Sequence, residues 1–159
     1  MPALQDLMPH NHCFGCGPNN PHGLRIKSRW SGSGPSEARF TPLAHHCAGP
    51  RHFVNGGVLA TLIDCHCVCT AAAAAYLAAG RAIGAAPDIH YATFSLSLTY
   101  LRPTPIGTEL VLLALPARAD ERTYVVSCAL HAAGKVCVEA VVKAVQVPES
   151  WIQGPRARA

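Results

Sequence analysis

The stretch from Val58 to Gly80 is apolar almost throughout, and it constrains the fold more than any other feature of the sequence. Asp64 is the only Asp, Glu, Lys or Arg between Arg51 and Arg81. A long helix that is apolar on nearly every face belongs inside a domain. A carboxylate in such a helix loses hydration, a cost that is tolerated only where neighbouring groups compensate it. The run predicts one buried helix, with Asp64 either as a functional acid or as a structural residue held by nearby hydroxyls.

Two glycines, Gly56 and Gly57, stand at the expected start of this helix. Residues without a side chain let the polar atom of a ligand approach the backbone N–H groups of a helix N-terminus, where the helix dipole is positive. A carboxylate about two turns further along, at Asp64, completes a plausible small active site.

Composition excludes several classes of protein. The 159 residues fit one domain, half of them are hydrophobic and only 14% are charged, which excludes a disordered or fibrous chain. The basic residues behind the net charge of +4 are scattered, so we expect no nucleic-acid partner. The apolar run is long enough to cross a membrane, but it carries Asp64 and His66 and is mostly alanine in its second half, so we expect no membrane partner.

The N-terminus lacks the basic start and apolar centre of a secretory signal, so we expect a cytoplasmic protein. In that reducing compartment the eight cysteines are not expected to form disulfides. Cys65, Cys67 and Cys69 lie within the helical run and are read as core residues.

Short strands are predicted on both sides of the helix. Strands joined by short turns pair antiparallel, so the fold class is α+β, with one helix against one antiparallel sheet. We expect a single domain over residues 1–159, with a core from about 13 to 147 and a loose tail at 148–159. The predicted strands are Leu24–Trp30, Ser36–Phe40, Thr93–Tyr100, Thr108–Ala119, Thr123–His131 and Lys135–Val147.

The strand Thr93–Tyr100 alternates cleanly between apolar and hydroxyl side chains. Strict alternation predicts that the two kinds of side chain point to opposite faces. The apolar face is expected to hold Phe94, Leu96, Leu98 and Tyr100, and the hydroxyl face Thr93, Ser95, Ser97 and Thr99.

Three blocks, in this order, resemble the hotdog-fold acyl-CoA thioesterases, and specifically the phenylacetyl-CoA-thioesterase-like (PaaI-like) branch. They are CFGCGPNNPHGLRIK at Cys13–Lys27, NGGVLATLID at Asn55–Asp64, and TFSLSLTYLRPTPIG at Thr93–Gly107. The resemblance implies a hotdog fold, in which a five- to six-stranded antiparallel sheet wraps one long central helix. It also implies a homodimer or homotetramer with active sites at the subunit interface, and hydrolysis of a fatty or aromatic acyl-CoA without a cofactor.

The resemblance further assigns roles to individual residues. Asp64 matches the family's acid, which acts on the thioester carbonyl as general base or nucleophile. Gly56 matches the glycine whose backbone N–H supports the thioester oxygen, and Thr93 falls where related enzymes hold the attacking water or the carboxylate. Asn55 departs from the usual His: it can donate a hydrogen bond, but it cannot exchange a proton near neutral pH.

Cationic side chains are expected around the mouth of a pocket that binds the phosphates of CoA. Arg102, in the Arg-Pro turn, is the first candidate, and Arg118 and Arg122 near a hairpin are weaker ones. Gly57 is expected to contact the substrate beside Gly56.

Three alternatives stay open. A non-catalytic acyl-CoA-binding sensor is compatible with the change at Asn55. An acyl-CoA hydratase or dehydratase is disfavoured because its acid works with a His, and His66 is on a different helix face from Asp64. Cys13 and Cys16 form half of a zinc ligand set, but a metal-free tight turn is favoured, because the second half lacks a regular spacing.

Overall fold

The predicted central helix is α1, Gly56–Ala78. The computed structural model describes residues 1–8 and 10–153. Asn55 caps the helix, and thirteen of its residues are buried. By length and composition α1 could cross a membrane, but 67% of its most apolar window is buried inside the fold. That burial accounts for the apolar run without a bilayer.

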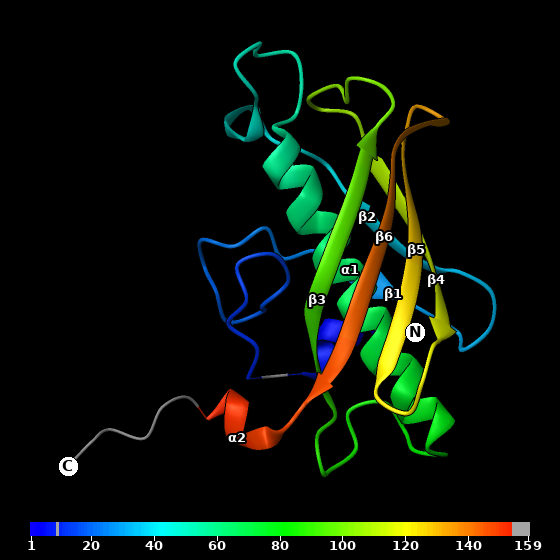
Figure 1. Ribbon diagram of the computed structural model, residues 1–159. Coiled ribbons are helices and arrows are strands. Elements are labelled where there is room, and N and C mark those ends of the chain that lie inside the picture. Colours follow the sequence, from blue (N-terminus) through cyan, green and yellow to red (C-terminus); the bar gives the residue numbers. More distant parts are fainter. Residues whose placement is uncertain (9, 154–159) are drawn as a thin grey trace.

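A six-stranded antiparallel sheet wraps α1, which confirms the predicted α+β hotdog architecture (Figure 1). The strand order is β1-β2-β4-β5-β6-β3, and α1 packs against the four strands β3 to β6. The long strand β3 is therefore an edge of the sheet. The strands are β1 Lys27–Arg29, β2 Ser36–Phe40, β3 His90–Tyr100, β4 Leu110–Arg118, β5 Thr123–Ala132 and β6 Lys135–Val147.

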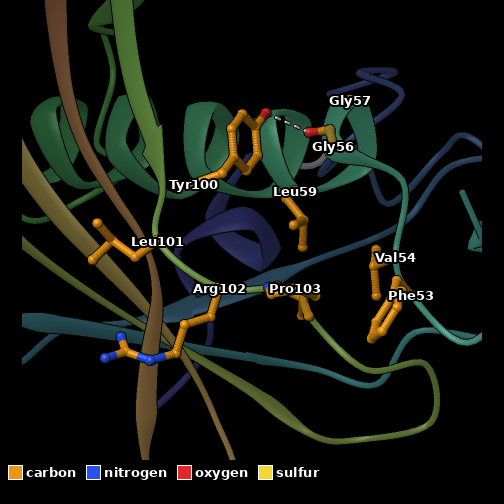
Figure 2. A pocket seen from close by; sticks show the side chains of 10 residues that line it. Phe53, Val54, Gly56, Gly57, Leu59, Tyr100, Leu101, Arg102 and Pro103 are labelled. Atoms are coloured by element: carbon orange, nitrogen blue, oxygen red, sulfur yellow. Dashed lines mark hydrogen bonds between the residues drawn. The ribbon is translucent and has the colours of Figure 1, made fainter.

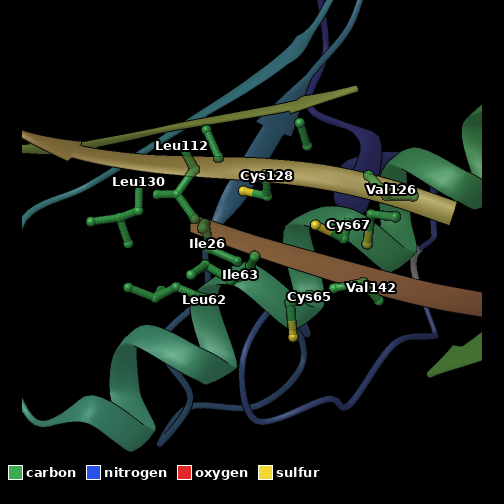
Figure 3. Packing of buried hydrophobic residues seen from close by; sticks show 14 of the residues in the cluster. Ile26, Leu62, Ile63, Cys65, Cys67, Leu112, Val126, Cys128, Leu130 and Val142 are labelled. Atoms are coloured by element: carbon green, nitrogen blue, oxygen red, sulfur yellow. The ribbon is translucent and has the colours of Figure 1, made fainter. Parts of the chain in front are cut away.

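The core lies between α1 and the concave face of the sheet. Leu62 and Ile63 of α1 are fully buried, as are Leu112, Leu130 and Val142 of the sheet (Figure 3). Each side chain of this kind contributes roughly 1.5–3 kcal/mol when it is removed from water. This packing holds α1 in one position against the strands.

The N-terminal segment covers part of α1 that the sheet leaves free. A 3-10 helix at Leu4–Leu7 buries Leu4 and Gln5, so the core extends further toward the N-terminus than predicted. His66 of α1 is fully buried, and its Nδ1 lies 2.8 Å from Ser28 Oγ, which also accepts from Gln5 Nε2 at 2.9 Å. Burial lowers the pKa of His66 to about 4, so this histidine is neutral and structural.

Most predicted elements differ from the structure at their ends: β3 begins three residues earlier than predicted, β4 is shorter at both ends, and β5 ends one residue later. β1 is shorter than the predicted Leu24–Trp30, because Leu24 and Ile26 donate to carbonyls of the N-terminal loop and Arg25 has a φ of 55°. The tail was predicted to be loose from residue 148, but Glu149–Ile152 forms the short helix α2. The rest of that tail, residues 154–159, lies outside the described residues.

The predicted alternation of β3 is wrong at its N-terminal end. Thr93 pairs with Ala144 and Ser95 pairs with the adjacent Lys143, so Phe94 is the extra residue of a β-bulge. Thr93 consequently shares the helix-facing side with Leu96, instead of the outer side with Ser95. Phe94 is 68% exposed, with Lys143 Nζ 4.8 Å from its ring centroid. Bulges re-aim side chains in this way and are frequent next to active sites.

Candidate active site

Asp64 and Thr93 meet where α1 crosses β3. Thr93 Oγ1 donates a hydrogen bond of 2.5 Å to Asp64 Oδ1. The contact exists because the bulge at Phe94 turns Thr93 toward the helix. Asp64 is half-buried, while Thr93 is exposed at the sheet edge of a single chain. The structure thus brings together two of the predicted catalytic residues.

The environment of Asp64 favours proton uptake. Burial raises the pKa of its carboxyl group, an effect that the hydrogen bond from Thr93 opposes and the nearby Cys16 reinforces. A carboxylate with a raised pKa is a stronger base than one in water. Asp64 therefore has the properties required of a general base. A carboxylate can also act as a nucleophile through one of its oxygens.

The start of α1 is organised by Asn55. Its Oδ1 accepts from Gly57 N at 2.8 Å and from Val58 N at 3.3 Å, so it is the N-cap of the helix. The N–H of Gly57 is therefore engaged within the chain. The N–H of Gly56 has no partner among the described residues, so it is the donor that remains for a ligand.

Tyr100 is a site residue, although the strand alternation predicted only a position on an apolar face. Its hydroxyl donates a 2.8 Å hydrogen bond to the carbonyl oxygen of Gly56 (Figure 2). A Cβ added at Gly56 would lie 3.3 Å from this hydroxyl, so a glycine fits closely under the ring. Because a Tyr in an alternating strand is usually a packing residue, the sequence carries no signal for this contact.

An open cleft of about 520 Å³ lies in front of the helix start (Figure 2). Its volume falls in the range of small-molecule sites. Thr104 also lines it, and the buried Oγ1 of this residue has no hydrogen-bond partner among the described residues. Arg102 lines the cleft as well, with its guanidinium turned toward β6, where Nη1 donates to Val136 O at 2.6 Å.

The other two predicted arginines lie elsewhere. Arg118 and Arg122 flank the β4–β5 turn, near the C-terminal end of α1 and far from its start (Figure 1). Arg118 lines a separate cavity of about 230 Å³ together with Ala75 and Ala78. Within one chain the structure brings Arg102, but not Arg118 or Arg122, to the cleft at Gly56.

Gly56 and Asp64 are two turns apart on the same helix. Their separation along the helix axis is about 12 Å. An oxyanion donor and a base that act on one carbonyl each lie roughly 3 Å from the reacting atoms. The Gly56 N–H and the Asp64 carboxylate of one chain are therefore too far apart to act on the same thioester.

One helix wrapped by a six-stranded sheet, with an acid in the helix and an open N–H at its start, defines a hotdog-fold protein of the thioesterase type. The chain belongs to the Thioesterase superfamily, whose family model matches residues 52–139. The match includes the helix start, Asp64, Thr93 and the Arg-Pro turn. Among curated proteins, none matches the sequence significantly.

Solved structures support this assignment. A Thioesterase superfamily protein from Shewanella loihica PV-4 is 35% identical, with a TM-score of 0.62 over 80% of this chain and 95% of that one. The PaaI protein of the E. coli phenylacetic acid degradation operon shares the fold, at 17% identity and a TM-score of 0.64 over 79% and 81%. So does a hypothetical thioesterase from Streptococcus pneumoniae TIGR4 solved with coenzyme A, at 13% identity and a TM-score of 0.62 over 77% and 88%.

Proposed function

We propose that the protein is an acyl-CoA thioesterase that hydrolyses a fatty or aromatic acyl-CoA to the free acid and CoA. The observation that carries the proposal is the Asp64–Thr93 pair, a half-buried carboxylate oriented by a hydroxyl donor. Membership of the Thioesterase superfamily supplies the reaction class. The coenzyme A bound by the Streptococcus pneumoniae protein of the same fold belongs to the proposed ligand class.

The reaction needs a base and an oxyanion donor. With Asp64 as general base, the carboxylate takes a proton from water while the water oxygen attacks the thioester carbon. The carbonyl oxygen gains negative charge, which the Gly56 N–H at the positive end of α1 stabilises. The C–S bond then breaks, and the CoA sulfur leaves and takes up a proton. With Asp64 as nucleophile, an acyl–Asp64 anhydride forms first and water cleaves it.

We infer that Asp64 and Gly56 of one site come from two chains. β3 is an unpaired edge, Tyr100 near its end contacts Gly56, and Thr93 near its start contacts Asp64. A two-fold axis through the middle of two antiparallel β3 edges places the Thr93 end of one strand beside the Tyr100 end of the other. The same operation sets Asp64 of one chain beside Gly56 of the other, which removes the 12 Å separation of about two helix turns.

Arg102 is the proposed contact for the phosphates of CoA, since it is the arginine at the cleft. Its guanidinium is exposed and uses one N–H on Val136 O, which leaves further donors for a phosphate. The assignment of Arg118 and Arg122 to CoA remains a proposal that requires a neighbouring chain to bring them near the site.

Release of CoA thiol from a broad panel of acyl-CoA substrates tests the activity. We expect turnover of at least one substrate, with kcat reduced by a factor of roughly 100 or more in Asp64→Asn, because the base is lost. Asp88→Asn is the matched control, since Asp88 is exposed and lies in the loop before β3. Binding of acyl-CoA without any thiol release would overturn the enzyme proposal and support the non-catalytic sensor.

A further inference from the structure

A cluster of cysteine thiols lies between the N-terminal loop and α1. The Sγ atoms of Cys13 and Cys65 are 3.6 Å apart, and those of Cys13, Cys16 and Cys65 all lie within 4.8 Å of one another. Cys65 points away from the sheet, whereas Cys67 points toward it (Figure 3). Cys65 is a core residue, as predicted, but its thiol faces the N-terminal loop and Cys13.

The loop is shaped to bring its two thiols onto the helix. Gly17 N donates to Cys13 O at 2.8 Å, which closes a tight turn around Cys13 and Cys16. A Cβ at Gly15 would lie 2.3 Å from Cys65 Sγ, and a Cβ at Gly17 would lie 2.4 Å from the backbone nitrogen of Cys13. Both positions therefore exclude a side chain, and the backbone of the turn is pressed against α1.

An amide donor also faces the cluster. Asn11 Nδ2 donates to Cys16 Sγ at 3.3 Å, and Asn11 Oδ1 accepts from Cys13 N at 2.9 Å. Hydrogen bonds of this kind fix the orientation of sulfur ligands in metal sites.

Cys69 supplies a fourth thiol. It follows Cys65 by four residues, which places both on one face of α1. Cys69 is buried and lies outside the group of Cys13, Cys16 and Cys65 whose Sγ atoms are all within 4.8 Å of one another, so its thiol must shift to complete the set. The complete set has the spacing C-x2-C from the loop and C-x3-C from the helix.

We propose that Cys13, Cys16, Cys65 and Cys69 bind one structural zinc ion per chain. Tetrahedral zinc with Zn–S bonds of about 2.3 Å requires sulfur atoms about 3.8 Å apart, close to the 3.6 Å between Cys13 and Cys65. Thiolates are soft ligands that select zinc over hard cations. Binding displaces the thiol protons to solvent as the four Zn–S bonds form, and no change of oxidation state is involved.

A disulfide or plain packing accounts for the cluster less well. A disulfide joins only two thiols, whereas the Sγ atoms of Cys13, Cys16 and Cys65 all lie within 4.8 Å of one another. Packing accounts for Cys67 and Cys128, and Cys16, Cys65 and Cys69 are buried in the same apolar core. Cys13, in contrast, is exposed, so no apolar burial holds it against Cys16 and Cys65.

The proposed ion would fasten the N-terminal loop to α1 directly beside Asp64. Its four protein ligands leave no open position, which is typical of structural zinc and distinguishes it from a catalytic ion.

Elemental analysis tests the site without any activity measurement, so its outcome is independent of the proposed thioesterase function. Full-length protein, purified without metal-affinity chromatography under reducing conditions, is expected to contain one zinc per chain. Cys13→Ser, at the exposed ligand, is expected to weaken zinc binding at least 10-fold. Cys47→Ser, at a partly exposed cysteine outside the cluster, is the matched control and should retain the metal.

Cobalt substitution of the wild-type protein gives a second readout that does not depend on how a variant folds. Co²⁺ is expected to show thiolate-to-metal charge transfer and the visible bands of a tetrahedral site. The proposal would be overturned if the protein contained far less than one zinc per chain while all eight cysteines could be titrated as free, reduced thiols. Zinc retained equally by Cys13→Ser would also overturn it, as would a mass two hydrogens lighter that reveals a disulfide.

Discussion

Asn55 caps α1 and leaves its own amide donors free within the part of the chain that the structure describes. Its Oδ1 caps α1, while the N–H donors of the same amide have no partner among the described residues. Asn is among the best N-cap residues, and this explains locally why the fold accepts Asn where the PaaI-like branch usually has His. In the proposed function, the replacement of His by Asn removes proton exchange but keeps an amide donor next to Gly56.

A substitution at Thr93 removes the hydrogen bond that orients Asp64 and leaves the Asp64 carboxylate itself in place. In Thr93→Val the donor to Asp64 is lost while the shape of the side chain is kept. A hydrogen bond to a charged group contributes about 1.5–3 kcal/mol, so kcat/KM is expected to fall by roughly 10- to 100-fold. The bond lowers the pKa of Asp64, so its loss raises that pKa further. The acid limb of the pH–rate profile should therefore move to higher pH.

Thr99→Val is the control for this prediction. Thr99 lies on the same strand, is exposed, and pairs with Glu139 away from the acid. Steady-state kinetics of both variants across pH measure the effect. An equal loss in the two variants would show that strand stability, and not the contact with Asp64, is responsible.

Among the helices and strands, those whose position depends on a local sequence pattern were predictable from that pattern. The helix was predictable because a run with a single charged residue has only the core to occupy, and β2 and β6 were predictable from turns and alternation. The direction of Thr93 was not, because one extra residue at Phe94 reverses the face of every residue before it. β1 could not be bounded either, since the N-terminal loop competes with β2 for the backbone groups of Leu24 and Ile26.

The residues of the candidate site also fall into two groups, those that lie in local sequence motifs and those that are placed by packing between distant segments. Asp64, Gly56 and Arg102 lie in or beside local motifs, which made them predictable as candidate site residues. Tyr100 and Cys65 acquire their contacts only when strand or loop packs on α1, so no spacing in the sequence indicates them.

The contact between the N-terminal loop and α1 predicts a stability effect at Gly15. In Gly15→Ala the new methyl group meets Cys65 Sγ at 2.3 Å and Thr61 Cγ2 at 2.8 Å, so the loop must move away from the helix. Overpacking of this kind costs about 1–3 kcal/mol. Urea unfolding measures the loss. Gly49→Ala, where a Cβ meets nothing within 4 Å, is expected to be neutral or slightly stabilising, and equal effects at both positions would contradict the assignment.

In the molecule as a whole, the outer edge of β3 lacks a pairing strand among the described residues. It spans eleven residues, has no partner along one edge in the single chain, and has exposed apolar side chains along it and directly after it. These are Phe94 at 68%, Tyr100 at 51% and Leu101 at 45% exposure. Long, unprotected edges of this kind are normally paired or covered in native proteins. The proposed partner is a second copy of the chain, which would also complete the proposed active site.

Mixing two inactive variants tests whether each site is shared between chains. Gly56→Pro removes the N–H donor and leaves the helix start compatible with its backbone, because proline suits the first position of a helix and Asn55 already has an extended ψ of 133°. Loss of one oxyanion donor is expected to lower kcat by about 100- to 1,000-fold. Asp64→Asn is expected to be inactive because it lacks the proposed base. A mixed dimer of the two variants contains one site with both defects and one site with neither.

Random pairing of equal amounts in dimers therefore restores about a quarter of the wild-type specific activity, measured as thiol release after co-expression. Gly56→Ala is the control for the steric part of the change, because it adds a Cβ 3.3 Å from the Tyr100 hydroxyl but keeps the N–H. It should stay far more active than Gly56→Pro. If each chain held a complete site, every chain in the mixture would carry one defect, and no activity would return.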